Sequence, residues 1–282
     1  MLKVFSNLSQ AFVNPHTTEG SEQLGQRILG ILQKKIFKAK DHPKGEAVQL
    51  PMLEPMLEKN LKLASKPFKK KKPATNPSKK KQSASWTRHK MINSLAQNST
   101  FWILKIIDAR NFPEPELQRV FDVFKAALTA YFDSKKSQTK PEFLKEIFRR
   151  RPWIGHNLFG FLLEKCGTAK SRFRQVEALD LLVEIMKSIV SVNADGSGTD
   201  ASKKMMKSYV PKFCHLIKEL VTNMPEKQAR RAEVRKFCGR VFQILKTLNL
   251  TAVFLKKLEP EAHTACESQL GELFLAVKKQ DQ

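Results

Sequence analysis

Residues 111–131 read NFPEPELQRVFDVFKAALTAY, and this stretch decides the fold class. Asn111, Pro113 and Glu114 have the form of a helix start: a capping side chain, a first-turn proline and an acidic residue. Apolar side chains then recur three or four residues apart and predict one buried helix face. They are Leu117, Val120, Phe121, Phe124, Leu128 and Tyr131.

The same helical periodicity continues in both directions from this stretch. We expect further helices over about residues 22–38, 53–63, 86–108, 141–150, 152–167, 170–192, 203–222, 226–248 and 260–279. Alternating strand patterns between tight turns are nearly absent. Helix starts near 113, 141, 170, 203, 226 and 260 fit irregular helical hairpins of HEAT or armadillo size. The sequence therefore predicts an all-α protein, an α-solenoid rather than a closed bundle.

One segment, Lys66–Lys81, interrupts this pattern and is called the strap below. It reads KPFKKKKPATNPSKKK, with lysines in two runs and prolines at 67, 73 and 77. Like charges repel and prolines break helices, so residues 65–85 are expected to form a disordered insertion. It would lie between a helical part over 1–64 and another over 86–282, as an insertion within one solenoid.

The chain is strongly basic. It has 282 residues, with 51 Lys and Arg against 27 Asp and Glu, a formal net charge of +24. Ten Lys and one Arg lie between Leu61 and Lys90 without an acidic residue, so the rest of the chain is basic as well. Such a surface attracts nucleic acid or acidic protein tails more than a membrane. No apolar run is long enough to span a bilayer.

The N-terminus carries no signal-peptide pattern, and it has too few arginines for a typical mitochondrial presequence, the alternative reading. Leu2, Phe5, Leu8 and Phe12 repeat at helical spacing directly after Met1, without a cap. We therefore expect the natural chain to extend further upstream.

Three sets of basic residues are candidate sites. The strap lysines suit an import receptor and would also neutralise phosphates; a merely solvated linker is the alternative. They are Lys69, Lys70, Lys71, Lys72, Lys79, Lys80 and Lys81. The other two sets lie on expected helices and would form a patch for nucleic acid or an acidic partner; the alternatives are a solvated face and a helix C-terminus. They are Arg149, Arg150 and Arg151, and Lys227, Arg230, Arg231, Arg235, Lys236 and Arg240.

No motif indicates catalysis, a cofactor or a metal. The histidines are dispersed, and Cys214 beside His215 lacks a second pair at zinc-ligand spacing. The four cysteines are expected to be buried, reduced thiols. The tryptophans, at 86, 102 and 153, are expected in the core rather than as base-stacking platforms.

Three segments carry a family resemblance. They are FWILKIIDARNFPEPELQRVFDVF (101–124), FRRRPWIGHNLFGFLLEKC (148–166) and YVPKFCHLIKELVTNMPEKQARRAEVRKFCGRVFQIL (209–245). These segments resemble the Myb-binding protein 1A family, also called the DNA polymerase V or phi family, and especially its plant members. The likeness covers most of the chain and corresponds to a C-terminal portion of much longer proteins.

The resemblance implies a nucleolar, armadillo-type protein that binds ribosomal DNA and transcription factors and acts in ribosomal RNA transcription and ribosome biogenesis. No catalytic motif corresponds to the polymerase name, so we expect no enzymatic activity. The sequence thus favours a nuclear scaffold for DNA and proteins. The alternatives are a pure protein-interaction solenoid, whose lysines serve only import, and a template-directed polymerase.

Overall fold

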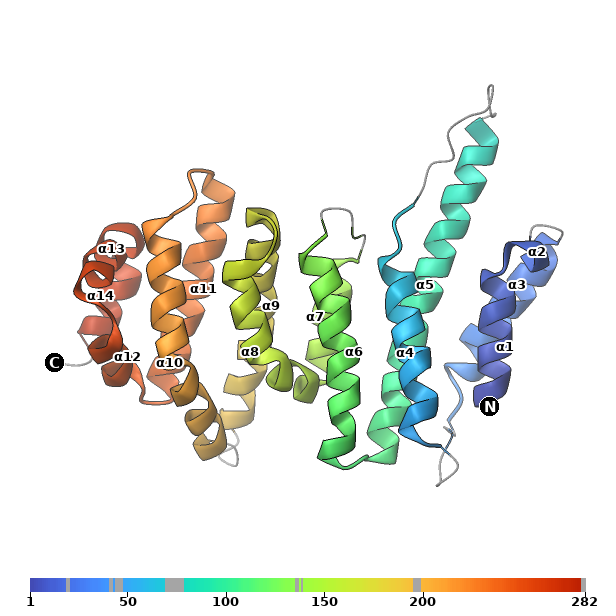
Figure 1. The fold of residues 1–282 in the computed structure, drawn as a ribbon, viewed down its shortest axis with the longest axis horizontal. Coiled ribbons are helices and arrows are strands. Elements are labelled where there is room, and N and C mark those ends of the chain that lie inside the picture. Colours follow the sequence, from blue (N-terminus) through green and yellow to red (C-terminus); the bar gives the residue numbers. More distant parts are fainter. Residues whose placement is uncertain are drawn as a thin grey trace. The chain divides into compact units, whose positions relative to one another are not determined.

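Helices make up the regular structure of this protein. The computed structural model describes residues 1–18, 21–40, 43, 48–68, 79–134, 137, 139–194 and 199–279; at residues 18, 79–83, 190–194 and 199 it describes the backbone alone. Within these ranges every regular element is helical, and no strand occurs (Figure 1). The all-α prediction is confirmed.

The chain divides into two compact units. Unit 1 comprises Met1–Tyr131 with Lys136–Lys140, and unit 2 comprises Phe132–Lys135 with Pro141–Gln282. The division lies where α6 ends, and the strap falls inside unit 1. The helices of unit 1 are α1 (Leu2–Val13), α2 (Pro15–Thr18), α3 (Glu22–Ile31), a π-helical turn (Leu32–Ile36), α4 (Leu50–Ser65), α5 (Lys79–Arg110) and α6 (Glu114–Phe132), whose last residue belongs to unit 2.

Helices α4 and α5 form an antiparallel hairpin, and the strap is the connection between them (Figure 1). Leu53 and Leu57 of α4 are fully buried, and so are Ile103 and Leu104 of α5. The Asn93 side chain also donates a hydrogen bond of 2.6 Å to the Ala64 carbonyl, near the end of α4. The strap is therefore an insertion within a packed hairpin, as its sequence suggested.

Helix α5 begins earlier than the sequence predicted. Its backbone is helical from Lys79, whereas the helical pattern was expected to resume near Trp86. The sequence has no proline or glycine between Pro77 and Pro113, and lysine has a good helix propensity, so nothing stops the helix from reaching back to Lys79. The rest of the predicted disordered insertion, residues 69–78, lies outside the described residues.

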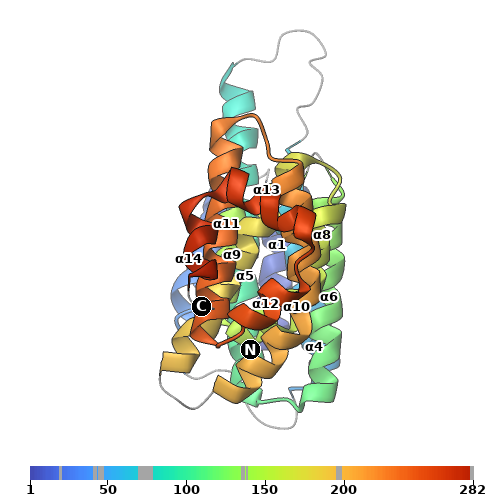
Figure 2. The same cartoon turned by 90° about the vertical axis from the view of Figure 1, so that its left-hand side faces the viewer.

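Unit 2 is a series of helical hairpins in two layers. Its helices are α7 (Pro141–Arg150), α8 (Pro152–Thr168), α9 (Arg172–Ala194), α10 (Thr199–Thr222), α11 (Gln228–Thr247), α12 (Thr251–Lys257), α13 (Pro260–Leu270) and α14 (Glu272–Lys278). Helices α8 and α10 lie in one layer, and α9, α11 and α14 lie in the other (Figure 2). Extensively packed pairs are at most three positions apart in chain order, which is the packing of an α-solenoid.

Asn111 ends one helix instead of starting the next, so the predicted cap is wrong. Its φ is 50°, in the left-handed region that asparagine tolerates. Its backbone N–H donates to the carbonyls of Ile107 and Asp108, both at 3.2 Å, which closes α5. Pro113 and Glu114 still mark the start of α6, which begins at Glu114.

The C-terminal region contains more helix ends than the sequence revealed. Asn249 (φ 53°) follows α11, and the Leu250 N–H donates to the Leu245 carbonyl at 2.7 Å, as in a Schellman motif. Gly271 separates α13 from α14, with φ 56° and ψ −128°, a backbone conformation that glycine adopts readily because it has no Cβ. The single helix expected over 260–279 is therefore two helices, and α12 was not predicted.

Candidate nucleic-acid interface

The strap lysines can be placed only in part. Lys79, Lys80 and Lys81 lie on the first turn of α5, where the backbone alone is described. Lys69, Lys70, Lys71 and Lys72 lie outside the described residues. Their predicted roles, an import signal and phosphate binding, stay predictions.

The arginine run at the end of α7 does not form a patch of three exposed cations. The Arg151 side chain is buried, with 8% of its surface exposed, at the junction of α7 and α8. Arg149 and Arg150 are half-exposed, and both donate to the Glu146 carboxylate, at 2.5 and 2.7 Å. Arg149 also bonds to Glu184 of α9 at 3.1 Å. Arg151 is buried because this turn of α7 packs against α8 and α9, and binding by Arg149 and Arg150 stays a prediction.

Asp180 of α9 joins three helices through two lysines. It accepts a bond of 2.5 Å from Lys145 of α7 and one of 3.2 Å from Lys236 of α11. Burial alone would raise the Asp180 pKa, but these hydrogen bonds lower it below its ordinary value. Burial also opposes the charge of Lys145, yet its bonds to Asp180 and Glu142 raise its pKa. Both groups therefore stay charged at neutral pH, and Lys236 has a structural role.

These contacts belong to a wider set of ion pairs along α7, α9 and α11, which we call the charged layer. Its members are the cations Lys145, Arg149, Arg150, Lys187 and Lys236 and the anions Glu142, Glu146, Asp180, Glu184 and Glu233. The opposite charges are equal in number, so they largely cancel one another's field. These paired side chains are poor candidates for attracting a polyanion.

The basic stripe predicted on α11 is divided between packing roles. Arg235 donates to the carbonyls of Gln269 and Leu270, the latter at 3.1 Å, and so caps the C-terminus of α13. Arg231 donates to the Gln269 side chain at 2.6 Å. Arg240 donates to Gln243 on its own helix at 2.8 Å.

The start of α11 keeps the remaining two members of the stripe. Lys227 is exposed and Arg230 is half-exposed. Four-residue spacing identified one side of α11 correctly, but it could not reveal that the C-terminal end of α13 lies beside this side.

A lysine row on α10 was missed by the sequence analysis. Lys204, Lys207 and Lys212 are exposed, and Lys203 is half-exposed. The signal was present in the sequence, because no acidic residue lies between Asp200 and Glu219. These lysines lie in the layer of α8 and α10, away from the charged layer. We call them the α10 lysine row.

A surface pocket of about 190 Å³ lies beside this row, between α10, α12 and α13. It is lined by Pro211, Cys214, His215, Lys218, Lys257, Glu259 and Ala262. Lys218 bonds to Glu259 at 2.5 Å across the pocket wall. Burial raises the Cys214 pKa to about 11, so its thiol is protonated at neutral pH. The pocket offers no activated nucleophile.

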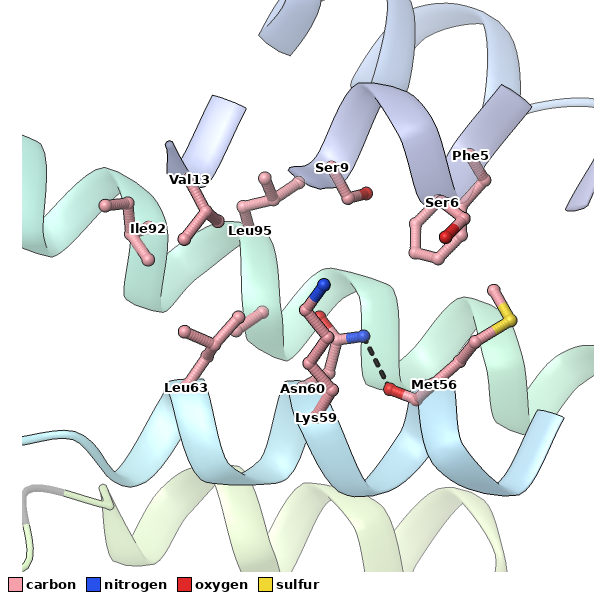
Figure 3. A pocket seen from close by; sticks show the side chains of 11 residues that line it. Phe5, Ser6, Ser9, Val13, Met56, Lys59, Asn60, Leu63, Ile92 and Leu95 are labelled. Carbon is pink, nitrogen blue, oxygen red and sulfur yellow. Dashed lines mark hydrogen bonds between the residues drawn. The ribbon is translucent and has the colours of Figure 1, made fainter. Parts of the chain in front are cut away.

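A second pocket, in unit 1 between α1, α4 and α5, is much smaller (Figure 3). Its volume of about 30 Å³ gives room for a water molecule rather than a ligand. The buried Ser9 hydroxyl at its edge has no hydrogen-bond partner among the described residues, whereas Asn60 donates to the Met56 carbonyl at 2.8 Å. A single water bound to Ser9 would satisfy this hydroxyl.

All four cysteines are buried and free of disulfides, which confirms that prediction. Burial raises the pKa of Cys166 and Cys238, and it raises that of Cys266 to about 12. Across the described ranges, no group of three or more His, Cys, Asp or Glu is arranged to hold a metal ion.

The tryptophans differ in their surroundings. Trp102 is 3% exposed and packs in the core of unit 1, as predicted, and Trp153 is half-buried. Trp86 is 40% exposed, so its assignment to the core is wrong. Its place, about two turns into α5, puts it beside Phe68 of the strap rather than in the hairpin core.

Comparison with known proteins places the chain in a family. In the described part of the chain, no helix combines the length and hydropathy needed to cross a membrane. No curated protein and no solved structure matches the chain. A family model described as Myb-binding protein 1A-like, TPR repeats, matches residues 76–274, from the strap into α14. This match covers more than half of the sequence and agrees with the resemblance of the three quoted segments. The chain therefore belongs to the Myb-binding protein 1A-like family of helical TPR-repeat proteins.

Proposed function

We propose that this protein is a nuclear, mainly nucleolar, scaffold that binds DNA and protein partners without enzymatic activity. Within that role it would regulate transcription of ribosomal DNA and support ribosome biogenesis, with transcription factors as partners. The observation that carries the proposal is the family match across residues 76–274. Stacked helical repeats present extended surfaces to protein partners, which suits a scaffold.

The nucleic-acid part of the proposal rests on where positive charge is exposed. The members of the charged layer are paired with one another, whereas no acidic residue lies between Asp200 and Glu219 on the helix that carries the α10 lysine row. Lysines that contact phosphates release counterions, so binding of this kind weakens steeply with salt and ignores base sequence. The α10 lysine row is therefore the proposed duplex contact, with the strap as the import signal.

A salt series tests this assignment. In filter binding of the full chain to a duplex ribosomal DNA fragment, the logarithm of the binding constant should fall linearly with the logarithm of the salt concentration. Replacing Lys204, Lys207 and Lys212 with glutamine should reduce the slope by roughly 0.9 per lost phosphate contact. The matched control replaces Lys34, Lys35 and Lys40, exposed lysines of unit 1. Absent or salt-insensitive binding would remove the nucleic-acid part, and an equal effect of the control would refute the α10 site.

The second candidate function is a pure protein-interaction solenoid, which the TPR-repeat description of the family favours. Deleting residues 69–81 discriminates between the two. Lost nuclear import together with unchanged DNA affinity, and no effect of the α10 substitutions, would favour this candidate. A nucleotide-incorporation assay on the purified chain tests the polymerase alternative, and we expect no incorporation.

A further inference from the structure

Three aromatic rings meet where the chain leaves α4 and enters α5. The Phe68 ring lies 5.0 Å from Trp86, edge to face, and 5.3 Å from His89, measured between centroids. Trp86 and His89 lie 5.8 Å apart with an interplanar angle of 17°, so their faces are nearly parallel. Phe68 is the last described residue before the first lysine run, and Trp86 follows the second run by five residues.

The backbone before Phe68 and two hydrogen bonds beside Trp86 position this cluster. Lys66 adopts an extended backbone (φ −65°, ψ 123°) before Pro67, which ends α4 and turns the chain toward α5. Arg88, two residues from Trp86, donates to the carbonyls of Phe12 and Asn14 at 3.2 and 3.4 Å. These bonds attach α5 to the end of α1, so the rings are positioned before any ligand arrives.

Trp86 is the exposed member of the cluster, and its setting is strongly basic. The Trp86 ring contacts the rings of Phe68 and His89, and 40% of the surface of Trp86 is still exposed. The Lys90 ammonium lies 5.1 Å from the centroid of the Trp86 ring. No acidic residue occurs from Lys59 to Lys105. A cationic ligand would be repelled here, whereas a flexible polyanion with flat aromatic groups would be attracted.

We propose that the cluster of Phe68, Trp86 and His89 is a base-stacking site for single-stranded nucleic acid. The proposal rests on the nucleic-acid part of the proposed function and adds a second, chemically distinct contact to it. In a duplex the bases are already stacked on one another, so they have no free face on which the Trp86 indole could stack. Bases of a single strand can stack on aromatic side chains while lysines bind the phosphates, and such stacking is largely independent of base identity.

The test uses the full chain and four probes of equal length. They are an unstructured single strand, as oligo(dT) and as oligo(U), the corresponding abasic strand, and a duplex. We expect Trp86→Leu to weaken binding of the single strands about tenfold, with little change for the abasic strand or the duplex. Trp86→Phe should recover most of the loss. Comparison of oligo(dT) with oligo(U) shows whether the strand is DNA or RNA.

Phe173→Ala is the matched control variant. Phe173 is a 57% exposed aromatic residue of unit 2 with a guanidinium, that of Arg174, 5.6 Å from its ring centroid. This variant should bind all probes as the unaltered chain does. Trp86 fluorescence, isolated by replacing Trp102 and Trp153 with phenylalanine, should be quenched by single strands and not by the abasic strand.

Failure of this inference differs from failure of the proposed function. Equal affinity for the single strand and its abasic counterpart, or no effect of Trp86→Leu, would overturn the stacking site while duplex binding by the α10 lysine row could persist. An equal loss for all probes would overturn it too, since that reports a general loss of fold or charge. Tryptophan-dependent binding of single strands without any salt-dependent duplex binding would support the stacking site and reject the duplex contact.

Discussion

Replacing Asp180 with asparagine should destabilise unit 2, because this carboxylate joins three helices. The substitution keeps the size of the side chain and removes its charge. Lys145 would then lie with only 16% of its side chain exposed, and Glu142, at 2.9 Å, would be its remaining ion-pair partner among the described residues. Glu142 is itself 74% exposed, so water screens its charge and it compensates poorly.

The expected loss follows from the burial of each partner. A hydrogen bond between charged groups contributes about 1.5–3 kcal/mol when shielded from water. The Lys145 bond approaches that case, whereas the bond to the half-exposed Lys236 contributes at most about 0.5 kcal/mol. We therefore expect Asp180→Asn to lower the unfolding free energy of unit 2 by about 2 kcal/mol. Glu142→Gln, the matched control, should cost about 0.5 kcal/mol or less.

The pH dependence gives a second, independent measurement. The folded pKa of Asp180 is lowered, so its contribution to stability is complete above its unfolded pKa, about 3.9, and is lost as the pH falls through the folded value. The difference between the unaltered chain and Asp180→Asn should therefore be constant from pH 7 to pH 5 and shrink below about pH 4. In urea titrations, hydrogen exchange of peptides from α7, α9 and α11 measures the unfolding of unit 2 alone. Equal losses for Asp180→Asn and Glu142→Gln, or a difference independent of pH down to 2, would refute the reasoning.

Three more outcomes are expected. Arg235→Met should lower stability by about 1 kcal/mol because it removes the cap of α13, whereas Arg231→Met, at an exposed site, should have little effect in the same urea titration. Gly155→Ala should cost about 1–3 kcal/mol, because its Cβ would lie 2.8 Å from an isoleucine side chain of α9; Gly30→Ala, in open space within α3, should instead stabilise by up to about 1 kcal/mol. Cys238 should resist alkylation at pH 8 until the chain is unfolded, since it is fully buried and its pKa is raised; rapid labelling of the native chain would contradict this.

The fold was predictable because helices with one apolar face repeat along most of the chain. The periodicity that identified the face of α6 agrees with the burial of Val120, Phe124 and Leu128. The errors fell at helix ends, where a single backbone conformation decides. Asn111 could be either a cap of α6 or the left-handed residue that closes α5, and the sequence alone does not distinguish these roles. Gly271 was read as an interior residue for the same reason.

The candidate site was less predictable, because a basic residue's spacing does not reveal its partner. Four-residue spacing places Arg231 and Arg235 on one side of α11, but only the tertiary packing brings the end of α13 against them. The exposure of a side chain also depends on tertiary packing. Trp86 and Trp102 lie on the same helix, yet Trp86 is 40% exposed and Trp102 is 3% exposed. The α10 lysine row could have been found by searching for helix faces that lack acidic residues.

The use of acidic residues in unit 2 determines where its positive charge is displayed. Across the chain 51 basic residues face only 27 acidic ones, so pairing cannot neutralise every surface. The charged layer places five carboxylates on α7, α9 and α11, where they fix the packing of these helices. The α10 lysine row, in the other layer, is left without such partners on its own helix between Asp200 and Glu219. In unit 2 the charged layer is therefore stabilised by its ion pairs, whereas the α10 lysine row leaves its charges exposed. Replacing the lysines of the α10 lysine row with glutamate should weaken DNA binding and leave the unfolding free energy of unit 2 unchanged. Reversing charges in the charged layer should lower that unfolding free energy and leave DNA binding unchanged.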